Sequence, residues 1–207
     1  MLSYMNEKEY SFLKKGDSLN MGIRIRGTGR YLPEKILTNA DFEKMVDTSD
    51  EWITTRTGIK ERHIAEAHTT TSDMAANAAR AALENANMDA NELDLILIAT
   101  VTPDHPFPNT ASIVQYKLGV KSCMCFDIEA ACSGLLYAID IAHAMIKSQK
   151  HRKVLVVGAE KLSSITDYTD RSTCVLFGDA ASAVILEGTD EVDYDFYTGS
   201  EVSANGA

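Results

Sequence analysis

Cys132 stands where a strand-like run of apolar residues gives way to a helical pattern, a position at which a thiol can act as a nucleophile. The apolar run covers residues 123–130, and the helical pattern follows the segment Ala131-Cys-Ser-Gly134. The first turn of a helix leaves backbone N–H groups unpaired and carries about half a positive elementary charge, which favours a thiolate over a thiol. The sequence therefore predicts a nucleophile at a helix start, with a small buried core cysteine as the alternative.

Trp52 and Arg56 form a second candidate site. Trp52 is the only tryptophan of the chain and lies one helical turn before Arg56, so both side chains share one face of a predicted helix. An indole ring can stack on an adenine, and a neighbouring guanidinium can pair with phosphates. The alternative is a core tryptophan covered by the arginine, which the residue types alone favour.

Two loops carry further candidates. Three of the four prolines fall in residues 102–108 (TPDHPFP), where their fixed φ angles stiffen a loop that presents Phe107. Phe107 either caps the core of its own chain or projects away from it. In the second loop, Arg171 follows Asp170, and a salt bridge between these two neighbours is one interpretation.

Two other patterns are rejected as sites. Residues 27–29 (Gly-Thr-Gly) begin like a dinucleotide-binding fingerprint, but Leu32 replaces its third glycine and Pro33 interrupts the expected helix. Cys123 and Cys125 alternate on one strand face, yet no second Cys or His pair lies at zinc-ligand spacing. We therefore expect buried core thiols and no metal site.

The composition is that of an ordinary globular protein: 207 residues, 45% hydrophobic and 24% charged, with a net charge of −10. The negative charge argues against non-specific binding to nucleic acid. No stretch reaches the about 18 apolar residues of a membrane span, and residues 1–20 lack the apolar centre of a signal peptide. The four cysteines lie in apolar or element-forming sequence, which favours free thiols and a cytoplasmic protein without a membrane partner.

Short apolar runs alternate with helical patterns along the chain. Strands separated by crossover helices imply an α/β fold, with a mainly parallel sheet that is covered on both faces. We predict strands over residues 21–27, 94–101, 124–128, 153–157 and 182–187, the last reached through a turn at 177–180. Helices are predicted from Ser72 to Ala86, after Asn109 up to Gly119, and over residues 132–148.

The order and spacing of several sequence blocks, from residue 21 to about residue 199, resemble those of the β-ketoacyl-acyl-carrier-protein synthase III family. The most specific pair is DTSDEWITTRTGI followed by AACSG, the block around Cys132. The resemblance implies a thiolase-like fold, in which two similar halves form a five-layered α-β-α-β-α sandwich with a mostly parallel mixed sheet, usually as a homodimer. By this comparison residues 21–207 are the N-terminal half. The matching blocks are GTGRYLPE (27–34), TNADFEKMVDTSDEWITTRTGIKERHIA (38–65), FPN (107–109), DIEAACSGLLYA (127–138), VVGAEKLS (156–163) and TDRSTCVLFGDAASAVIL (169–186).

The resemblance also implies a role for each matching residue. Cys132 corresponds to the active-site cysteine, which takes an acyl group from a thioester, and its backbone N–H would be one donor of an oxyanion hole. Trp52 and Arg56 correspond to residues that hold the adenine end of coenzyme A, with Thr48 nearby and Arg171 on the same nucleotide.

Phe107 corresponds to a residue that crosses the dimer interface and closes the acyl pocket of the partner subunit, which limits the size of the primer. The implied substrates are a short acyl-CoA and malonyl-acyl-carrier protein. No permanently bound cofactor is implied.

The chain departs from the family in one respect. The family's catalytic histidine and asparagine lie in motifs resembling PHQAN and HGN, and neither motif occurs in these 207 residues. Because those groups polarise the thioester carbonyl and stabilise the carbanion formed on decarboxylation, we expect the chain alone to fail in condensation. We interpret it as a truncated or split product, and residues 1–20 as a misassigned start or a solvated, disordered extension.

The leading hypothesis is the N-terminal half of a decarboxylating condensing acyltransferase that initiates fatty-acid synthesis through an acyl group on Cys132. One alternative is a relative within the superfamily, such as a 3-hydroxy-3-methylglutaryl-CoA synthase. The other is a non-catalytic partner subunit that retains the half-fold, which the intact Cys132 disfavours and the missing motifs favour.

Overall fold

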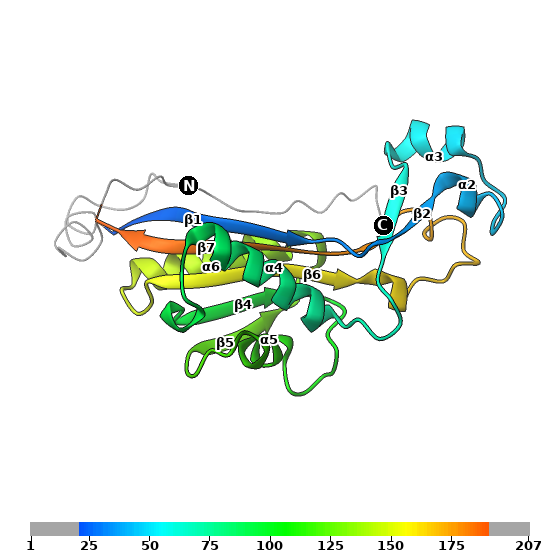
Figure 1. The fold of residues 1–207 in the computed structure, drawn as a ribbon. Helices are drawn as coiled ribbons and strands as arrows, with labels where there is room; N and C mark the ends of the chain where they lie inside the picture. Colours follow the sequence, from blue (N-terminus) through cyan, green and yellow to red (C-terminus); the bar gives the residue numbers. More distant parts are fainter. Residues whose placement is uncertain (1–20, 191–207) are drawn as a thin grey trace, which may run out of the picture.

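The centre of the molecule is a five-stranded sheet with the order β1-β7-β6-β4-β5 (Figure 1). The structure is a computed structural model that describes residues 21–190, so the predicted extension over 1–20 and the predicted domain end over 191–207 lie outside the described residues. β4 pairs in parallel with β5 and β6, whereas β7 runs antiparallel to both β6 and β1. Only β7 is reversed among these five strands, which confirms the predicted mixed, mostly parallel sheet. The strands are β1 (Gly22–Tyr31), β4 (Leu95–Ala99), β5 (Met124–Ile128), β6 (Lys153–Lys161) and β7 (Asp179–Thr189).

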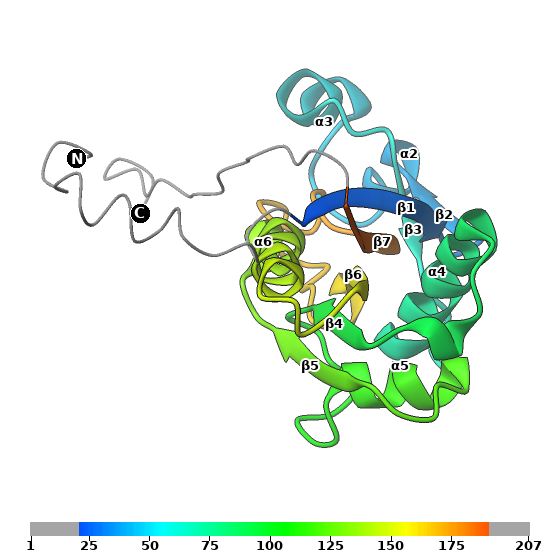
Figure 2. The same cartoon turned by 90° about the vertical axis from the view of Figure 1, so that its left-hand side faces the viewer.

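Helices cover both faces of the sheet. α6 lies on one face and α4 with α5 lies on the other, so that the described residues form three layers, α-β-α (Figure 2). Successive residues of β4 point to opposite faces, with Ile96 and Ile98 in the α4 core and Leu95 and Leu97 in the α6 core. This double burial explains why β4 is a continuous apolar run in the sequence. The three helices are α4 (Thr71–Ala86), α5 (Thr110–Leu118) and α6 (Gly134–Lys147), and three short 3₁₀ turns are η1 (Ala90–Glu92), η2 (Ala131–Ser133) and η3 (Leu162–Ser164).

The glycines at 27 and 29 serve this packing. A Cβ atom at Gly29 would overlap the backbone carbonyl of Ala78, and one at Gly27 would overlap that of Ala82. The buried alanines of α4 therefore let the helix lie directly on β1, and β1 needs glycine at the two contact points. This close approach explains the fingerprint-like pattern without any nucleotide.

Three strands are longer than the sequence pattern predicts. β1 continues to Tyr31, β6 continues to Lys161, and β7 begins at Asp179, inside the predicted turn at 177–180. These extensions pair with one another, since Tyr31 lies opposite Ala181 and Lys161 lies opposite Asp179. Antiparallel ladders rest on backbone hydrogen bonds and tolerate polar side chains on an open face, so the apolar pattern ends before the strands do.

A smaller unit projects beyond one end of the sheet (Figure 1). The buried residues Phe42 and Ile53 of this unit pack with Cys174 and Val175, which belong to the segment between β6 and β7. The sequence pattern predicts only α3 among its elements, because four-residue elements are too short to show a periodicity. The elements are an antiparallel pair, β2 (Lys35–Thr38) and β3 (Glu61–Ile64), and two helices, α2 (Asn39–Phe42) and α3 (Asp50–Thr57).

Within the described residues, none of the helices combines the length and the apolar character that a membrane crossing needs.

Candidate active site

Cys132 lies in the 3₁₀ turn η2, directly before α6, and it is exposed. The 14-residue α6 follows at Gly134, so the predicted place of the cysteine at a helix start is confirmed. The preceding Ala131 has a φ of 44°, in the left-handed region that alanine rarely adopts. Such a conformation costs about 1–3 kcal/mol and persists where the surrounding structure enforces it, often at functional sites. No local sequence signal marks Ala131 in advance.

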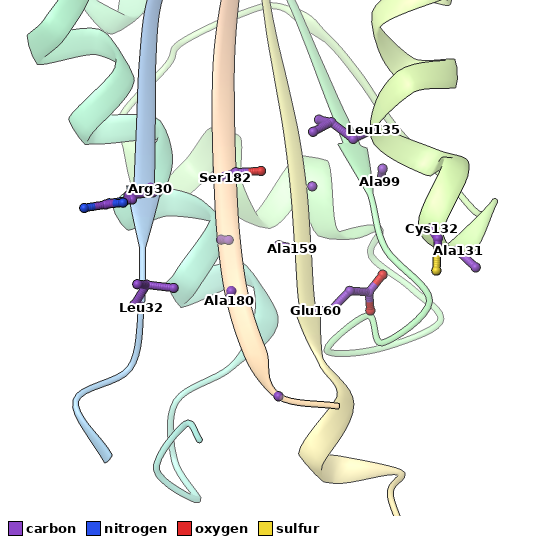
Figure 3. A pocket seen from close by; sticks show the side chains of 13 residues that line it. Arg30, Leu32, Ala99, Ala131, Cys132, Leu135, Ala159, Glu160, Ala180 and Ser182 are labelled. Atoms are coloured by element: carbon purple, nitrogen blue, oxygen red, sulfur yellow. The ribbon is translucent and has the colours of Figure 1, made fainter. Parts of the chain in front are cut away.

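Cys132 borders an open cavity of about 420 Å³ between the start of α6 and the neighbouring ends of the sheet strands. In Figure 3, Cys132 lies on the α6 side, Arg30 of β1 and Leu32 just beyond that strand lie on the far side, and Glu160 lies between them. The remaining lining is small or apolar: Ala99, Ala131, Leu135, Gly158, Ala159, Gly178, Ala180, Ala181 and Ser182. A cavity of this size and lining next to a thiol can accept a short apolar group.

Glu160 is the carboxylate of this cavity, and no sequence pattern around it indicates a role in a site. Its Oε1 accepts a hydrogen bond from the backbone N–H of Val101 at 2.8 Å, and its Oε2 accepts one from the hydroxyl of Thr102 at 2.7 Å. The hydroxyl of Thr100 lies 3.4 Å from the same Oε2. Both oxygens are thus engaged by the turn that follows β4, so Glu160 fixes the start of the proline-rich loop.

The far end of that loop is fixed by a second carboxylate. Asp127 of β5 accepts hydrogen bonds from the backbone N–H groups of Thr110 and Ala111, both at 2.7 Å, at the start of α5. Phe107 stands between the two anchors and is 89% exposed. The alternative in which Phe107 caps its own core is therefore wrong for the described residues.

Trp52 and Arg56 come together on α3 as predicted. The hydroxyl of Ser49 caps this helix by accepting a hydrogen bond from the backbone N–H of Trp52 at 3.0 Å. The Cζ atom of Arg56 lies 4.5 Å from the centroid of the Trp52 ring, and the Cζ atom of Arg171 lies 4.8 Å from it. Trp52 is half-buried and also packs against the core around Phe42. It therefore has both the core contact expected of a structural tryptophan and the guanidinium contacts expected of a ligand-binding one.

Arg171 does not pair with Asp170, which corrects the salt bridge considered as an alternative. Asp170 accepts hydrogen bonds from the hydroxyls of Ser172 and Thr173, both at 2.6 Å, and so closes a tight turn. The Nη1 atom of Arg171 instead lies 3.7 Å from the Oδ2 atom of the exposed Asp47.

Thr48 follows Asp47 in the chain and directly precedes the cap of α3. Its hydroxyl is buried and has no hydrogen-bond partner within the described residues. Leaving such a group unpaired costs about 1–3 kcal/mol, and a polar group of a ligand would remove that cost. The structure thus brings Arg56 and Arg171 onto the ring of Trp52, and Thr48 precedes the cap of the helix that carries Trp52.

The cysteines differ in their surroundings, although all four are free thiols as predicted. Burial, with smaller contributions from Cys125 and Asp94, raises the pKa of Cys123 to about 11. Burial likewise raises the pKa of the fully buried Cys174. Cys123 and Cys125 are only partly buried and lie against the α4 core. In the part of the chain that the structure describes, no group of three or more His, Cys, Asp or Glu side chains could hold a metal ion.

Comparison with known proteins gives a consistent result. A family model described as 3-oxoacyl-[acyl-carrier-protein (ACP)] synthase III matches residues 126–206. The β-ketoacyl-[acyl-carrier-protein] synthase III of Aquifex aeolicus (strain VF5) is 59% identical over 171 residues, which cover 83% of this chain and 55% of that protein. The corresponding protein of Geobacillus kaustophilus (strain HTA426) is 57% identical over 166 residues, which cover 80% of this chain and 54% of that protein.

Solved structures agree with these sequence relatives. The crystal structure of the Aquifex aeolicus synthase III is 60% identical with a TM-score of 0.79, over 80% of this chain and 54% of that one. The priming β-ketosynthase from the R1128 polyketide biosynthetic pathway is 36% identical with a TM-score of 0.81, over 84% of this chain and 52% of that one. The chain therefore spans about half the length of the curated relatives it matches. The relatives favour the synthase III assignment over a 3-hydroxy-3-methylglutaryl-CoA synthase.

Proposed function

The chain belongs to the β-ketoacyl-[acyl-carrier-protein] synthase III family, and we propose that it takes a short acyl group from coenzyme A onto Cys132. The observation that carries the proposal is the position of Cys132: an exposed thiol at the start of α6, on the edge of a cavity with small and apolar walls. The cluster of Trp52, Arg56 and Arg171 supplies a matching place for the nucleotide end of the substrate.

In the proposed step, the Cys132 thiolate attacks the thioester carbonyl carbon and forms a tetrahedral intermediate with a negative oxygen. The C–S bond to coenzyme A then breaks, the electron pair leaves with the coenzyme A thiolate, and the acyl group stays on the cysteine. Backbone N–H groups at the start of α6 are the donors that would stabilise the negative oxygen. The left-handed Ala131 supports this role, because it turns the chain sharply from β5 into the first turn of the helix.

The nucleotide site follows from the side chains around Trp52. The indole face offers a stacking surface for adenine, and the guanidiniums of Arg56 and Arg171 offer positive charge for its phosphates. The pair of Arg171 with Asp47 is exposed and long at 3.7 Å, so phosphate can replace it at small cost. The unpaired hydroxyl of Thr48 supplies a further polar group.

For the whole protein we propose the initiating condensation of fatty-acid synthesis, in which the acyl group on Cys132 is joined to malonyl-acyl-carrier protein. By the resemblance, this second step needs a histidine and an asparagine in motifs that these 207 residues do not contain. We also propose a cytoplasmic homodimer in which Phe107 enters the acyl pocket of the partner subunit. The large exposure of Phe107 and of Tyr116 on α5 supports such an interface.

The test separates acyl transfer from condensation. The 207-residue chain is incubated with acetyl-CoA, and the protein mass and the labelled peptide are determined. We expect one acetyl group on Cys132, no label in Cys132→Ser, and unchanged labelling in Cys125→Ser. Titration with coenzyme A should quench the fluorescence of Trp52, and Arg171→Ala should weaken that binding by about tenfold, the loss of one charge-assisted contact.

The alternative of a non-catalytic subunit predicts a different result. It allows binding of coenzyme A but no acetyl group on Cys132 in a folded sample. Release of CO₂ from malonyl-acyl-carrier protein by the 207-residue chain alone would contradict the roles assigned to the absent histidine and asparagine.

A further inference from the structure

Arg62 of β3 is a buried cation with an unusual set of partners. The residue is 3% exposed. Its Nε donates to the backbone carbonyl of Val175 at 2.9 Å, its Nη2 donates to the same carbonyl, and its Nη1 donates to Oδ1 of Asn39 at 2.5 Å. Its Cζ lies 4.7 Å from the ring centroid of Phe42. These partners are neutral, and no carboxylate pairs with Arg62 among the described residues. Because burying a charge is costly, and ion pairing does not offset that cost here, the burial of Arg62 needs another explanation.

The first connection runs from Arg62 to α3. Asn39 is 2% exposed, and its Nδ2 donates to Oδ1 of Asp50 at 2.7 Å and to the backbone carbonyl of Ile59 at 2.9 Å. Asp50 is the first residue of α3, and Ile59 lies just beyond its end. Asn39 therefore holds both ends of the helix that carries Trp52, and Arg62 holds Asn39.

The second connection runs from Arg62 to residues 165–178, the segment between η3 and β7 that carries Arg171. Val175, whose carbonyl Arg62 binds, follows Arg171 by one turn, and the backbone N–H of Cys174 donates to the carbonyl of Asp170 at 3.0 Å within that turn. Fixing the carbonyl of Val175 therefore fixes the turn from which Arg171 reaches the Trp52 ring.

We propose that Arg62 is a positioning residue, which joins the segment that carries Arg171 to the helix that carries Trp52 and Arg56. Its planar guanidinium donates in two directions at once, which one lysine ammonium on a flexible stem cannot reproduce. The proposal rests on the proposed function only for the identity of the ligand. The geometry that it assigns to Arg62 stands without any ligand.

The same residue lies beside the Cys132 cavity. A Cβ atom at Gly178, which lines that cavity, would lie 3.1 Å from Cβ of Arg62 and 3.0 Å from the carbonyl of His63. The next residue, Asp179, is 2% exposed and accepts a hydrogen bond from the backbone N–H of Ala65 at 2.7 Å. β3 and the residue after it thus contact one wall residue of the Cys132 cavity as well as the segment that carries Arg171.

The primary test needs no ligand. Trp52 is the single tryptophan, so quenching of its fluorescence by acrylamide reports how well its ring is covered. We expect Arg62→Met to increase the quenching constant about twofold, since the guanidinium of Arg171 would no longer be held over the ring. Arg24→Met is the matched control, because Arg24 is exposed and pairs with Glu187 on the β1–β7 edge, so the quenching constant should not change.

A second measurement separates positioning from a general loss of stability. The dissociation constant of coenzyme A is measured well below the unfolding midpoint of each variant, and we expect Arg62→Met to raise it about tenfold. Arg62→Lys keeps the charge but cannot bond Val175 and Asn39 together, so it should not restore binding. Full restoration of quenching and binding by lysine would overturn the bridging role.

Where Arg62→Met fails to fold, Asn39→Ala decides the question. This change breaks the link from Arg62 to α3 on both sides of Asn39, since the bonds to Asp50 and Ile59 are lost with the bond to Arg62. The bonds of Arg62 to Val175 remain, so the quenching constant of Trp52 should rise through the release of α3 alone. Unchanged quenching in a folded Arg62→Met or Asn39→Ala protein overturns the inference. Failure of the wild-type chain to bind coenzyme A would instead count against the proposed function, while the quenching comparison still decides the role of Arg62.

Discussion

Alkylation with iodoacetamide should distinguish Cys132 from the other three thiols. The reagent reacts with thiolates, so the rate expected for Cys123 follows from the pKa of its thiol. Burial raises the pKa of Cys123 from the ordinary value of 9.0 to about 11, which lowers its thiolate fraction near neutral pH about 100-fold. The higher pKa also makes the thiolate that does form more nucleophilic, by about tenfold for a Brønsted slope of about 0.5. Cys123 should therefore react about tenfold more slowly than an unshifted thiol before any steric hindrance is counted.

The other two thiols are hindered in different ways. Cys174 is fully buried and its pKa is raised by burial, so the reagent reaches it only when the structure opens. Cys125 is partly buried and donates a hydrogen bond to Oε1 of Gln115 at 3.3 Å. Cys132 is the exposed member of the four, in an open cavity at a helix start. We expect its labelling to be at least about tenfold faster than that of Cys123.

The assay follows the labelled peptides by mass spectrometry over time in the folded 207-residue chain. Cys132→Ser should remove the fast phase and leave the slow reactions unchanged. Equal rates at all four cysteines, with circular dichroism showing a folded sample, would refute the claim that the position of Cys132 activates it.

Two further predictions concern stability and assembly. Burial alone would raise the pKa of Asp73, but hydrogen bonds from Lys117 and Thr70 outweigh it and lower the pKa to about 2. This folded-state pKa lies below the unfolded value, so the ionised carboxylate stabilises the fold at neutral pH. After discounting for the exposure of the side chain, Asp73→Asn should lower the free energy of unfolding by about 1 kcal/mol at pH 7. In urea titrations the difference in unfolding free energy between wild type and Asp73→Asn should disappear between about pH 4 and 2, and a difference that persists at pH 2 would contradict the pKa given for Asp73. Phe107→Ala should change monomer stability by less than about 0.5 kcal/mol, since the ring is 89% exposed, yet weaken self-association in sedimentation velocity. Equal self-association of variant and wild type would remove Phe107 from the proposed interface.

The parts of the fold that the sequence predicts well are those fixed by neighbours in the chain. The strand at 124–128 and the helix after Cys132 were predictable because a short apolar run is followed at once by a helical period. Trp52 and Arg56 share a face for the same reason, since a helix brings residues four apart together. The reversed direction of β7 was not predictable, because the apolar pattern of a strand is the same in both directions.

The parts that escape prediction depend on contacts between distant residues. Arg62 stands in a charged stretch, KERH, that does not indicate burial, and the Val175 carbonyl that it binds lies 113 residues further along the chain. The left-handed backbone of Ala131 has no local signature either, because alanine is chosen there against its own preference.

One segment explains why the site looks dispersed in the sequence and compact in the structure. Residues 165–178 follow β6 and carry Arg171 to the Trp52 ring, the carbonyl of Val175 to Arg62, and Gly178 to the wall of the Cys132 cavity. The segment holds little regular structure of its own, so its path is set by the side chains that it meets. A substitution that loosens it should therefore affect the nucleotide cluster and the thiol cavity together, even though Cys132 lies 80 positions after Trp52 and 39 positions before Arg171.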